Sequence, residues 1–509
     1  MKRSIFILLF VSVLTAGKLE VIIDPKIELL GVIEYLALDE STNRNRQVFD
    51  DDNEYVREVK KHFENYANHD AVVSFRELQK KGFNFEAPVI LLLEASNPPD
   101  LDVKFPLPEF LSSKANENPK VGEQKLFEWL VELREFAKES EFIKFFDAHK
   151  SLYENISTPM AKVLKSEDTP EKLEEFFGES KKSYTVILAP LYSGGYSHLN
   201  SKENSFVIVG PTKVEDDLPH FCYHRTPQFV MNAIAFAFVE PIVDDNWDFF
   251  AKSAKLYDHI VEMMIQQSIP NWQMALSEHF TKAAILNIDE SNIEGELNLV
   301  SSVSWGLWYL PEIDDLIKKE FINRREKYPR FTDFAHKISE LLAEMSKLPH
   351  DIISDRVSAA ITVKTTNVWA MAEKNCKKLV FTDIMTLIRL DMELYLDKAE
   401  HVFRCFMDTQ DPNDEHYWQV KYQVGKIRFM KKDYDGAERI FNDYLKNQPD
   451  GELAAGAFWR LGQINEITGD LKQAEQLYEH ALKLDPNLLQ AQQSLNRLRI
   501  NMEKDEQSQ

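Results

Sequence analysis

The spacing of hydrophobic positions along the chain predicts a structure that is mostly helical. Val56, Val59 and Phe63 recur at the three- to four-residue interval of one helix face, which predicts an amphipathic helix over residues 52–67. A Phe-rich stretch over residues 127–153 has the same character, and almost everything after position 226 is expected to be helical. The helical pattern therefore dominates the chain.

Two stretches have the composition and length of β-strands. Residues 184–191 and 205–210 are expected to be strands, and the Gly-Gly turn within 192–196 predicts a β-hairpin with a long connection. The apolar run 87–93 is too short for its pattern to decide between strand and helix. The expected fold class is α+β, mostly helical, with a small β-sheet in the N-terminal part.

One predicted helix is apolar on every side. Residues 229–239 contain a single polar residue, Asn232, and a helix of this kind is buried in a core. Because proline disrupts a helix interior, the helix is expected to end at Pro241. Asn232 is then either a buried amide that is hydrogen-bonded to the backbone or a functional group at the bottom of a cleft.

Three segments near the C-terminus repeat one pattern. They are Lys398–Phe403, Gly436–Phe441 and Gln473–Tyr478, each with an Ala-Glu pair, and each is followed by a proline. Their alanines are 38 and 37 positions apart. This spacing of small and aromatic residues resembles the tetratricopeptide repeat, a helix–turn–helix unit that stacks into an α-solenoid.

The small and aromatic residues of the last two repeats are expected to set their packing. The glycines let the two helices of a unit approach closely, the alanines lie in the groove of the second helix, and the aromatic residues fill the space between units. Such an array presents a surface to a protein or peptide, or serves as a rigid docking extension. The signature positions are Gly425, Ala437, Phe441, Gly462, Ala474, Tyr478 and Ala481.

The first 17 residues have the order of a secretory signal peptide. Lys2 and Arg3 precede an apolar run over residues 5–14, and the small residues Thr15 and Gly17 follow it. The run is too short to span a bilayer, and no cysteine follows it that could carry a lipid. We expect cleavage after Gly17 and an exported protein, periplasmic or extracellular, without a membrane anchor. The alternative is a buried N-terminal strand.

The charge of the chain argues against two classes of partner, and its cysteine count limits the number of disulfides. The chain has 60 basic and 83 acidic residues, a net charge of −23 at pH 7. Nucleic acids and anionic membranes are bound through an excess of Lys and Arg, so neither is an expected partner. The three cysteines, Cys222, Cys376 and Cys405, allow at most one disulfide, and the sequence does not select the pair.

His220, Cys222 and His224 form a weak candidate for a metal site. On a strand, all three side chains would face one side. Same-face neighbours on a strand are about 6.6 Å apart, so three of them cannot converge on one ion without distortion. We therefore expect a strand or loop that leads into the apolar helix, and no metal or other cofactor.

A set of aromatic and polar residues in the first 330 positions carries a family resemblance. The set comprises Tyr55, Val59, His62, Phe63, His69, Phe136, Phe142, Phe146, His149, Tyr153, Tyr184–Leu191, Trp272, Glu278, Ala283, Tyr309–Glu312 and Asn323–Pro329. Their order and spacing resemble an exported bacterial family, domain of unknown function 4932. The resemblance implies a gluzincin-type zinc metallopeptidase fold, in which a buried helix carries His-Glu-x-x-His. Its two histidines bind zinc, its Glu is the general base, and a Glu on a later helix is the third ligand.

The positions that match this motif have lost its chemistry. The segment Ala237–Pro241 aligns with the end of the family's motif, so the motif positions are Asn232, Ala233, Ile234, Ala235 and Phe236. Asparagine is a poor zinc ligand, phenylalanine cannot bind zinc, and alanine cannot move a proton. Glu278 alone stands at the third-ligand position. It is either a relic that lies close to Asn232 or an ordinary surface carboxylate.

These observations predict four segments. They are a signal peptide (1–17), a catalytically dead metallopeptidase-like domain (18–385), tetratricopeptide-like repeats with a capping helix (386–503) and a disordered tail (504–509). The predicted function is non-catalytic binding of protein or peptide, through the repeat array and through the relic cleft. The alternatives are an active hydrolase that uses His220, His224 and Glu278, and a purely structural scaffold.

Overall fold

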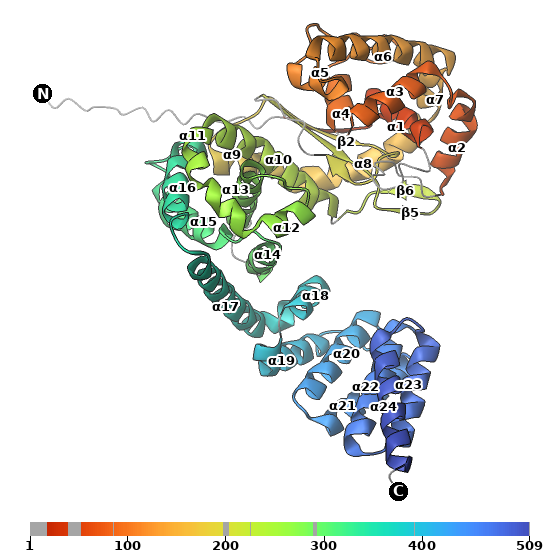
Figure 1. Cartoon of the computed structure of the whole chain (residues 1–509), viewed down its shortest axis with the longest axis vertical. Helices are drawn as coiled ribbons and strands as arrows, with labels where there is room; N and C mark the ends of the chain where they lie inside the picture. The colour runs from red at the N-terminus through yellow and green to blue at the C-terminus, as the bar shows by residue number, and fades with distance from the viewer. Residues whose placement is uncertain are drawn as a thin grey trace, which may run out of the picture. The chain divides into compact units, whose positions relative to one another are not determined.

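The computed structural model describes residues 18–38, 52–84, 86–196, 203–223, 225–288, 293–390 and 392–507. The chain folds into two compact units (Figure 1). The first contains residues 1–288 and 305–350, and the second contains 289–304 and 351–509. The boundary predicted at 385 falls inside the second unit, because the helices before the repeats pack with the repeats.

The first unit begins with one strand and a set of helices. Their bounds are β1 (Lys18–Ile22), α1 (Pro25–Ala37), α2 (Glu54–Phe63), α3 (Asp70–Lys81), α4 (Glu86–Leu93), α5 (Glu109–Ala115), α6 (Pro119–Glu139), α7 (Phe142–Ala148) and α8 (Lys150–Ser166). Their apolar faces form one core, in which Trp129 stacks on Phe75 and donates a 3.1 Å hydrogen bond to the Ala71 carbonyl. The amphipathic helix predicted over 52–67 is α2, and the ambiguous run 87–93 is helix α4.

A four-stranded sheet in the first unit has the order β1-β2-β4-β3. The central strands β2 (Ser183–Leu188) and β4 (Asn204–Val209) run parallel, β1 is parallel to β2, and β3 (Gly195–Tyr196) is antiparallel to β4. The prediction that the two longer strands form a hairpin was therefore wrong. The long connection between them is the reason, since it lets the chain return along β3 before it enters β4.

A second set of helices follows in the first unit. The bounds are α9 (Thr169–Phe177), α10 (Arg225–Asp245), α11 (Trp247–Phe250), α12 (Val261–Gln266), α13 (Trp272–Ile288), α15 (Leu310–Leu316) and α16 (Phe331–Met345). Helix α10 packs along α13 and against β4. It is long and apolar enough to cross a membrane, but 72% of its apolar window is buried inside the protein, as in a core helix. A small hairpin, β5 (Lys213–Glu215) and β6 (Leu218–His220), precedes it.

Two predicted helix boundaries were wrong. The Phe-rich stretch 127–153 is divided among α6, α7 and α8, because Glu141 has a φ of 50° that a right-handed helix cannot accommodate. Helix α10, in contrast, continues through Pro241 to Asp245. The proline removes one backbone hydrogen bond, and the packing of this buried helix outweighs that loss.

The second unit is helical throughout the residues that the structure describes. Its helices are α14 (Ile293–Ser304), α17 (His350–Asn375), α18 (Phe381–Arg389), α19 (Leu396–Met407), α20 (Glu415–Met430), α21 (Tyr434–Asn447), α22 (Glu452–Thr468), α23 (Leu471–Leu484) and α24 (Leu489–Gln507). From α19 onward each helix packs against the next one, as in a solenoid. Helix α24 continues into the residues that were predicted to be a disordered tail. The chain as a whole is α+β and mostly helical, as predicted.

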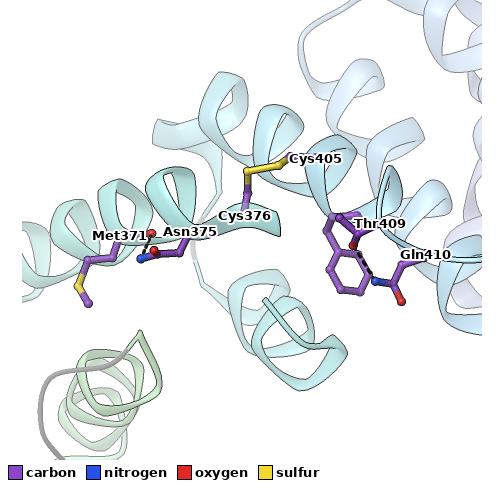
Figure 2. Close-up of a disulfide and its surroundings, with 7 residues drawn as sticks. Met371, Asn375, Cys376, Cys405, Thr409 and Gln410 are labelled. Carbon is purple, nitrogen blue, oxygen red and sulfur yellow. Dashed lines mark hydrogen bonds between the residues drawn. A yellow bond between two sulfur atoms is a disulfide. The ribbon is translucent and has the colours of Figure 1, made fainter. Parts of the chain in front are cut away.

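A disulfide links α19, at the start of the repeats, to the segment that directly follows α17 (Figure 2). Cys376, which directly follows α17, bonds to Cys405 on α19, and their Cα atoms are 5.7 Å apart. Cys222 lies in the first unit, outside this bridge. The structure thus pairs Cys376 with Cys405, a choice among the three cysteines that the sequence did not make.

Candidate functional site

Asn232 lies on α10 where this helix packs along α13. Its side-chain Nδ2 donates a 2.7 Å hydrogen bond to the carbonyl of Gln228, one turn earlier on the same helix. The other two motif positions are apolar and buried, since Ala233 is 2% and Phe236 is 5% exposed. Neither offers an electron pair to a metal or a group that could move a proton.

Lys282 lies next to Asn232. From α13, Lys282 Nζ donates a 2.6 Å hydrogen bond to the side-chain oxygen of Asn232. Glu278 lies one turn before Lys282 on the same helix face, because residues four apart are neighbours on a helix. Lys282 therefore hydrogen-bonds Asn232 and acts electrostatically on Glu278, the two positions that the family resemblance related.

Lys282 and Glu278 are oppositely charged side chains in a poorly solvated part of the protein. Burial raises the pKa of Glu278, and the positive charge of Lys282 opposes this rise. Burial lowers the pKa of Lys282, and the negative charge of Glu278 opposes this fall. Each charge thus stabilises the ionised form of the other.

The residues around Asn232 do not fit a catalytic zinc ion. Such an ion takes three protein ligands, from His, Cys, Asp or Glu. This site offers one carboxylate and one amide oxygen, and the ammonium of Lys282 already holds the amide and would repel a second cation. Within the ranges that the structure describes, no three His, Cys, Asp or Glu side chains lie close enough to share a metal.

The other candidate metal residues lie at the β5–β6 hairpin and after it. His220 ends β6, and its Nδ1 lies 2.7 Å from the carboxylate of Glu215 on β5. Cys222 follows in the segment that leads to α10. His224 lies outside the described residues. The structure thus gives His220 a carboxylate neighbour within its own hairpin.

The repeats form tightly packed helix pairs. A Cβ at Gly425 of α20 would lie 2.7 Å from the ring of Phe441 on α21. In the next pair, a Cβ at Gly462 of α22 would lie 2.5 Å from the ring of Tyr478 on α23. Both glycines are therefore places where an aromatic ring of the same unit approaches the backbone. The three alanines at signature positions are fully buried: Ala437, Ala474 and Ala481.

Comparison with known families relates both parts of the chain to recognised patterns. The family described as Domain of unknown function (DUF4932) matches residues 19–341. The chain belongs to this family. A tetratricopeptide repeat matches residues 455–488, which cover α22 and α23. No curated protein and no solved structure matches the chain.

The DUF4932 domain also has a surface pocket of about 610 Å³, away from Asn232. Helix α2 contributes Tyr55, Glu58 and His62 to its lining. The lining also includes Phe145 and Ala148 of α7 and Leu152 and Asn155 of α8. Just before α8, His149 lies in this pocket with Nε2 2.6 Å from the Glu58 carboxylate and Nδ1 2.8 Å from the Phe145 carbonyl. Beneath it, the buried hydroxyl of Tyr55 donates to the carboxylate of Glu28 at 3.1 Å.

Sequence reasoning missed both Lys282 and this pocket. The signal for Lys282 was its place four residues after Glu278, which puts both side chains on one face of a helix. Of the pocket residues, Tyr55, His62 and His149 entered only through the family resemblance, because Glu58 and His149 are 91 positions apart in the sequence. Only their packing shows that Glu58 and His149 are neighbours.

Proposed function

We propose that this protein is an exported, non-catalytic member of the DUF4932 family that binds other proteins through its repeat array. The observation that carries the non-catalytic part is the hydrogen bond from Lys282 to Asn232. An ammonium group fills the place where a metallopeptidase of the related type would hold its metal. Ala233, at the position of the general base, leaves no group there to activate water.

The repeat array supports the binding part of this proposal. Tetratricopeptide repeats have an extended surface that docks proteins or peptides, and the array here contains well-packed helix pairs from α20 to α23. A relic cleft at Asn232 is the weaker candidate for peptide binding, because Lys282 and Phe236 fill its surroundings. The array is therefore the proposed binding surface.

Two observations support export. The order of charged, apolar and small residues over 1–17 is that of a signal peptide. The disulfide between Cys376 and Cys405 also fits an oxidising compartment, where such bonds persist. A mass measurement of the mature protein from its native host tests the cleavage, which should remove 17 residues.

The alternative functions have less support. A hydrolase that uses His220, His224 and Glu278 requires Glu278 to act as a free acid or base, whereas Glu278 faces the charge of Lys282. A purely structural scaffold would leave the array surface without a ligand. A random-peptide display selection against the intact protein separates the scaffold from the binding protein, since the scaffold should select no peptides.

Metal analysis tests the non-catalytic part. The purified protein is expected to contain no stoichiometric zinc and to have no peptidase activity. Zinc at one ion per chain, with activity that a chelator removes, would overturn the proposal. A variant with Asn232→His, Ala233→Glu, Phe236→His and Lys282→Ala is expected to bind zinc, and the same variant with Lys282 retained is its matched control and is expected to bind far less.

A further inference from the structure

In the 610 Å³ pocket of the DUF4932 domain, the face of α2 is acidic at one end and basic at the other. Glu54, Glu58 and Lys61 line this pocket, and their spacing of four and three positions places them on one face of the helix. Glu54 and Lys61 are exposed, and neither has an ion pair with any residue that the structure describes. With a rise of about 1.5 Å per residue, they lie about 10.5 Å apart along the helix. The pocket thus offers one unpaired carboxylate and one unpaired ammonium group at a defined separation.

The middle of the pocket holds a carboxylate whose position is fixed by a histidine. Nε2 of His149 lies 2.6 Å from the Glu58 carboxylate, and Nδ1 lies 2.8 Å from the Phe145 carbonyl. The centres of the Phe145 and His149 rings are 4.2 Å apart, so the imidazole is also held by packing. Because a carboxylate has about four lone-pair sites, Glu58 can accept an N–H group of a ligand while it keeps its contact with His149.

Apolar side chains complete the lining between these polar groups. Phe145 and Ala148 of α7, Leu152 of α8 and Leu218 of β6 all line the pocket. In a ligand pocket, apolar walls provide burial and a few polar groups fix the orientation of the ligand. The ligand that matches this arrangement has an apolar middle, a positive charge at one end and a negative charge at the other.

We propose that this pocket binds a peptide of about three residues with free ends, with its terminal ammonium at Glu54 and its terminal carboxylate at Lys61. An extended chain spans about 3.3–3.6 Å per residue, so three residues cover the distance between the two charges. Glu58 accepts a backbone N–H group of the peptide, and the middle side chain lies against Leu152. This inference goes beyond the binding role proposed for the repeat array, since every lining residue belongs to the first unit.

The test titrates the intact protein with the tripeptide Ala-Leu-Ala by isothermal titration calorimetry. Saturable binding of one peptide per chain is expected. Acetylation of the amino end or amidation of the carboxyl end is expected to weaken binding at least about tenfold, the effect of losing one charge-assisted hydrogen bond. Absence of saturable binding up to about 10 mM, or equal binding by the peptide blocked at both ends, would overturn the inference.

Variants of α2 assign each end of the peptide. Glu54→Gln is expected to weaken binding of Ala-Leu-Ala about tenfold and to leave binding of its acetylated form unchanged, because that form has already lost the ammonium group. Lys61→Gln should have the same relation to the amidated form. Lys60→Gln and Glu64→Gln are the matched controls, since both residues are exposed near the same helix end and neither lines the pocket. Equal binding by the pocket variants and the controls would contradict the assignment.

The two blocked peptides also separate this ligand from a simpler one. If the amidated peptide binds as tightly as Ala-Leu-Ala, the pocket recognises an organic cation alone and the proposed zwitterionic ligand is wrong. If the acetylated peptide binds as tightly, the pocket recognises only the carboxylate, which would also overturn the proposal. Neither result depends on whether the repeat array binds a protein.

Discussion

Gly462 on α22 lies so close to Tyr478 on α23 that a Cβ at Gly462 would be 2.5 Å from Cε1 of the ring. The hydroxyl of Tyr478 donates a 2.7 Å hydrogen bond to Glu466 on α22, which keeps the ring in this position. The two helices of the last repeat are therefore held together by a ring that touches the backbone of its neighbour.

The first prediction is that Gly462→Ala destabilises the repeat array. Helix propensity alone would make this change stabilising by about 1 kcal/mol, since alanine is the better helix former. The crowded ring reverses the sign, and we expect a loss of about 1–3 kcal/mol in the free energy of unfolding. Urea unfolding followed by circular dichroism measures it. Tyr478→Leu, which removes the ring, should make Gly462→Ala harmless; a stabilised single variant would contradict the close packing.

The second prediction concerns the charge pair on α13. Lys282→Met is expected to lower the free energy of unfolding by about 1–3 kcal/mol, because Asn232 loses its donor and Glu278 loses its neighbouring cation. Adding Glu278→Gln should recover part of this loss, since the uncompensated charge is then removed. Thermal unfolding of the two single variants and the double variant measures the coupling. Losses that simply add would show that the two charges do not interact.

The third prediction is a loss of stability as the pH rises. Glu28 and Glu34 on α1 are 2% and 4% exposed, and burial raises the pKa of each to about 8. The unfolded chain releases these protons near pH 4.5, whereas the folded chain holds them until about pH 8. The folded state therefore binds more protons in this window, and its stability falls as pH increases through it.

The variant Glu28→Gln tests this assignment. Glutamine keeps an oxygen that can accept the hydrogen bond from Tyr55, and it has no proton to release. We expect it to stabilise the protein at pH 8 and to flatten the decline of stability between pH 5 and pH 8, with little effect at pH 4.5. Urea unfolding at several pH values provides the measurement. An exposed carboxylate, as in Glu54→Gln, is the control and should leave the slope unchanged.

The fourth prediction concerns the disulfide. Its two cysteines are 29 positions apart, and replacing both by serine is expected to lower the stability of the second unit by about 2–4 kcal/mol. Alkylation of the denatured but unreduced protein should modify one cysteine, Cys222, and reduction should make all three reactive. Peptide mass spectrometry distinguishes these states. Modification of Cys376 or Cys405 without reduction would show that the bridge is not formed.

Some features of the fold could be predicted from the sequence because they depend on local pattern. The periodicity of α2, the continuous apolar surface of α10 and the spacing of the repeats each follow from residues close together in the chain. Strand direction could not be predicted, because β2 and β4 have the same hydrophobic pattern in a parallel and in an antiparallel pair. The continuation of α10 past Pro241 depended on packing that the sequence does not display.

At the candidate site, the sequence could predict only that the side chains for zinc chemistry are absent. The sequence shows that Asn232, Ala233 and Phe236 cannot perform zinc chemistry, because side-chain type alone decides that question. It does not show which side chain contacts Asn232, since a single lysine in a helix has no pattern that marks its partner. The hydrogen bond between Lys282 and Asn232 joins positions 50 apart, and only the packing of α13 on α10 reveals it.

The parallel pairing of β1 with β2 sets an order of events in synthesis. Lys18 of β1 pairs with Ser183 of β2, so the first strand emerges long before its partner exists. Throughout that interval its backbone groups are unpaired, in the state that makes strand edges prone to aggregation. Pairing of β1 therefore has to wait until residues 183–187 have been synthesised.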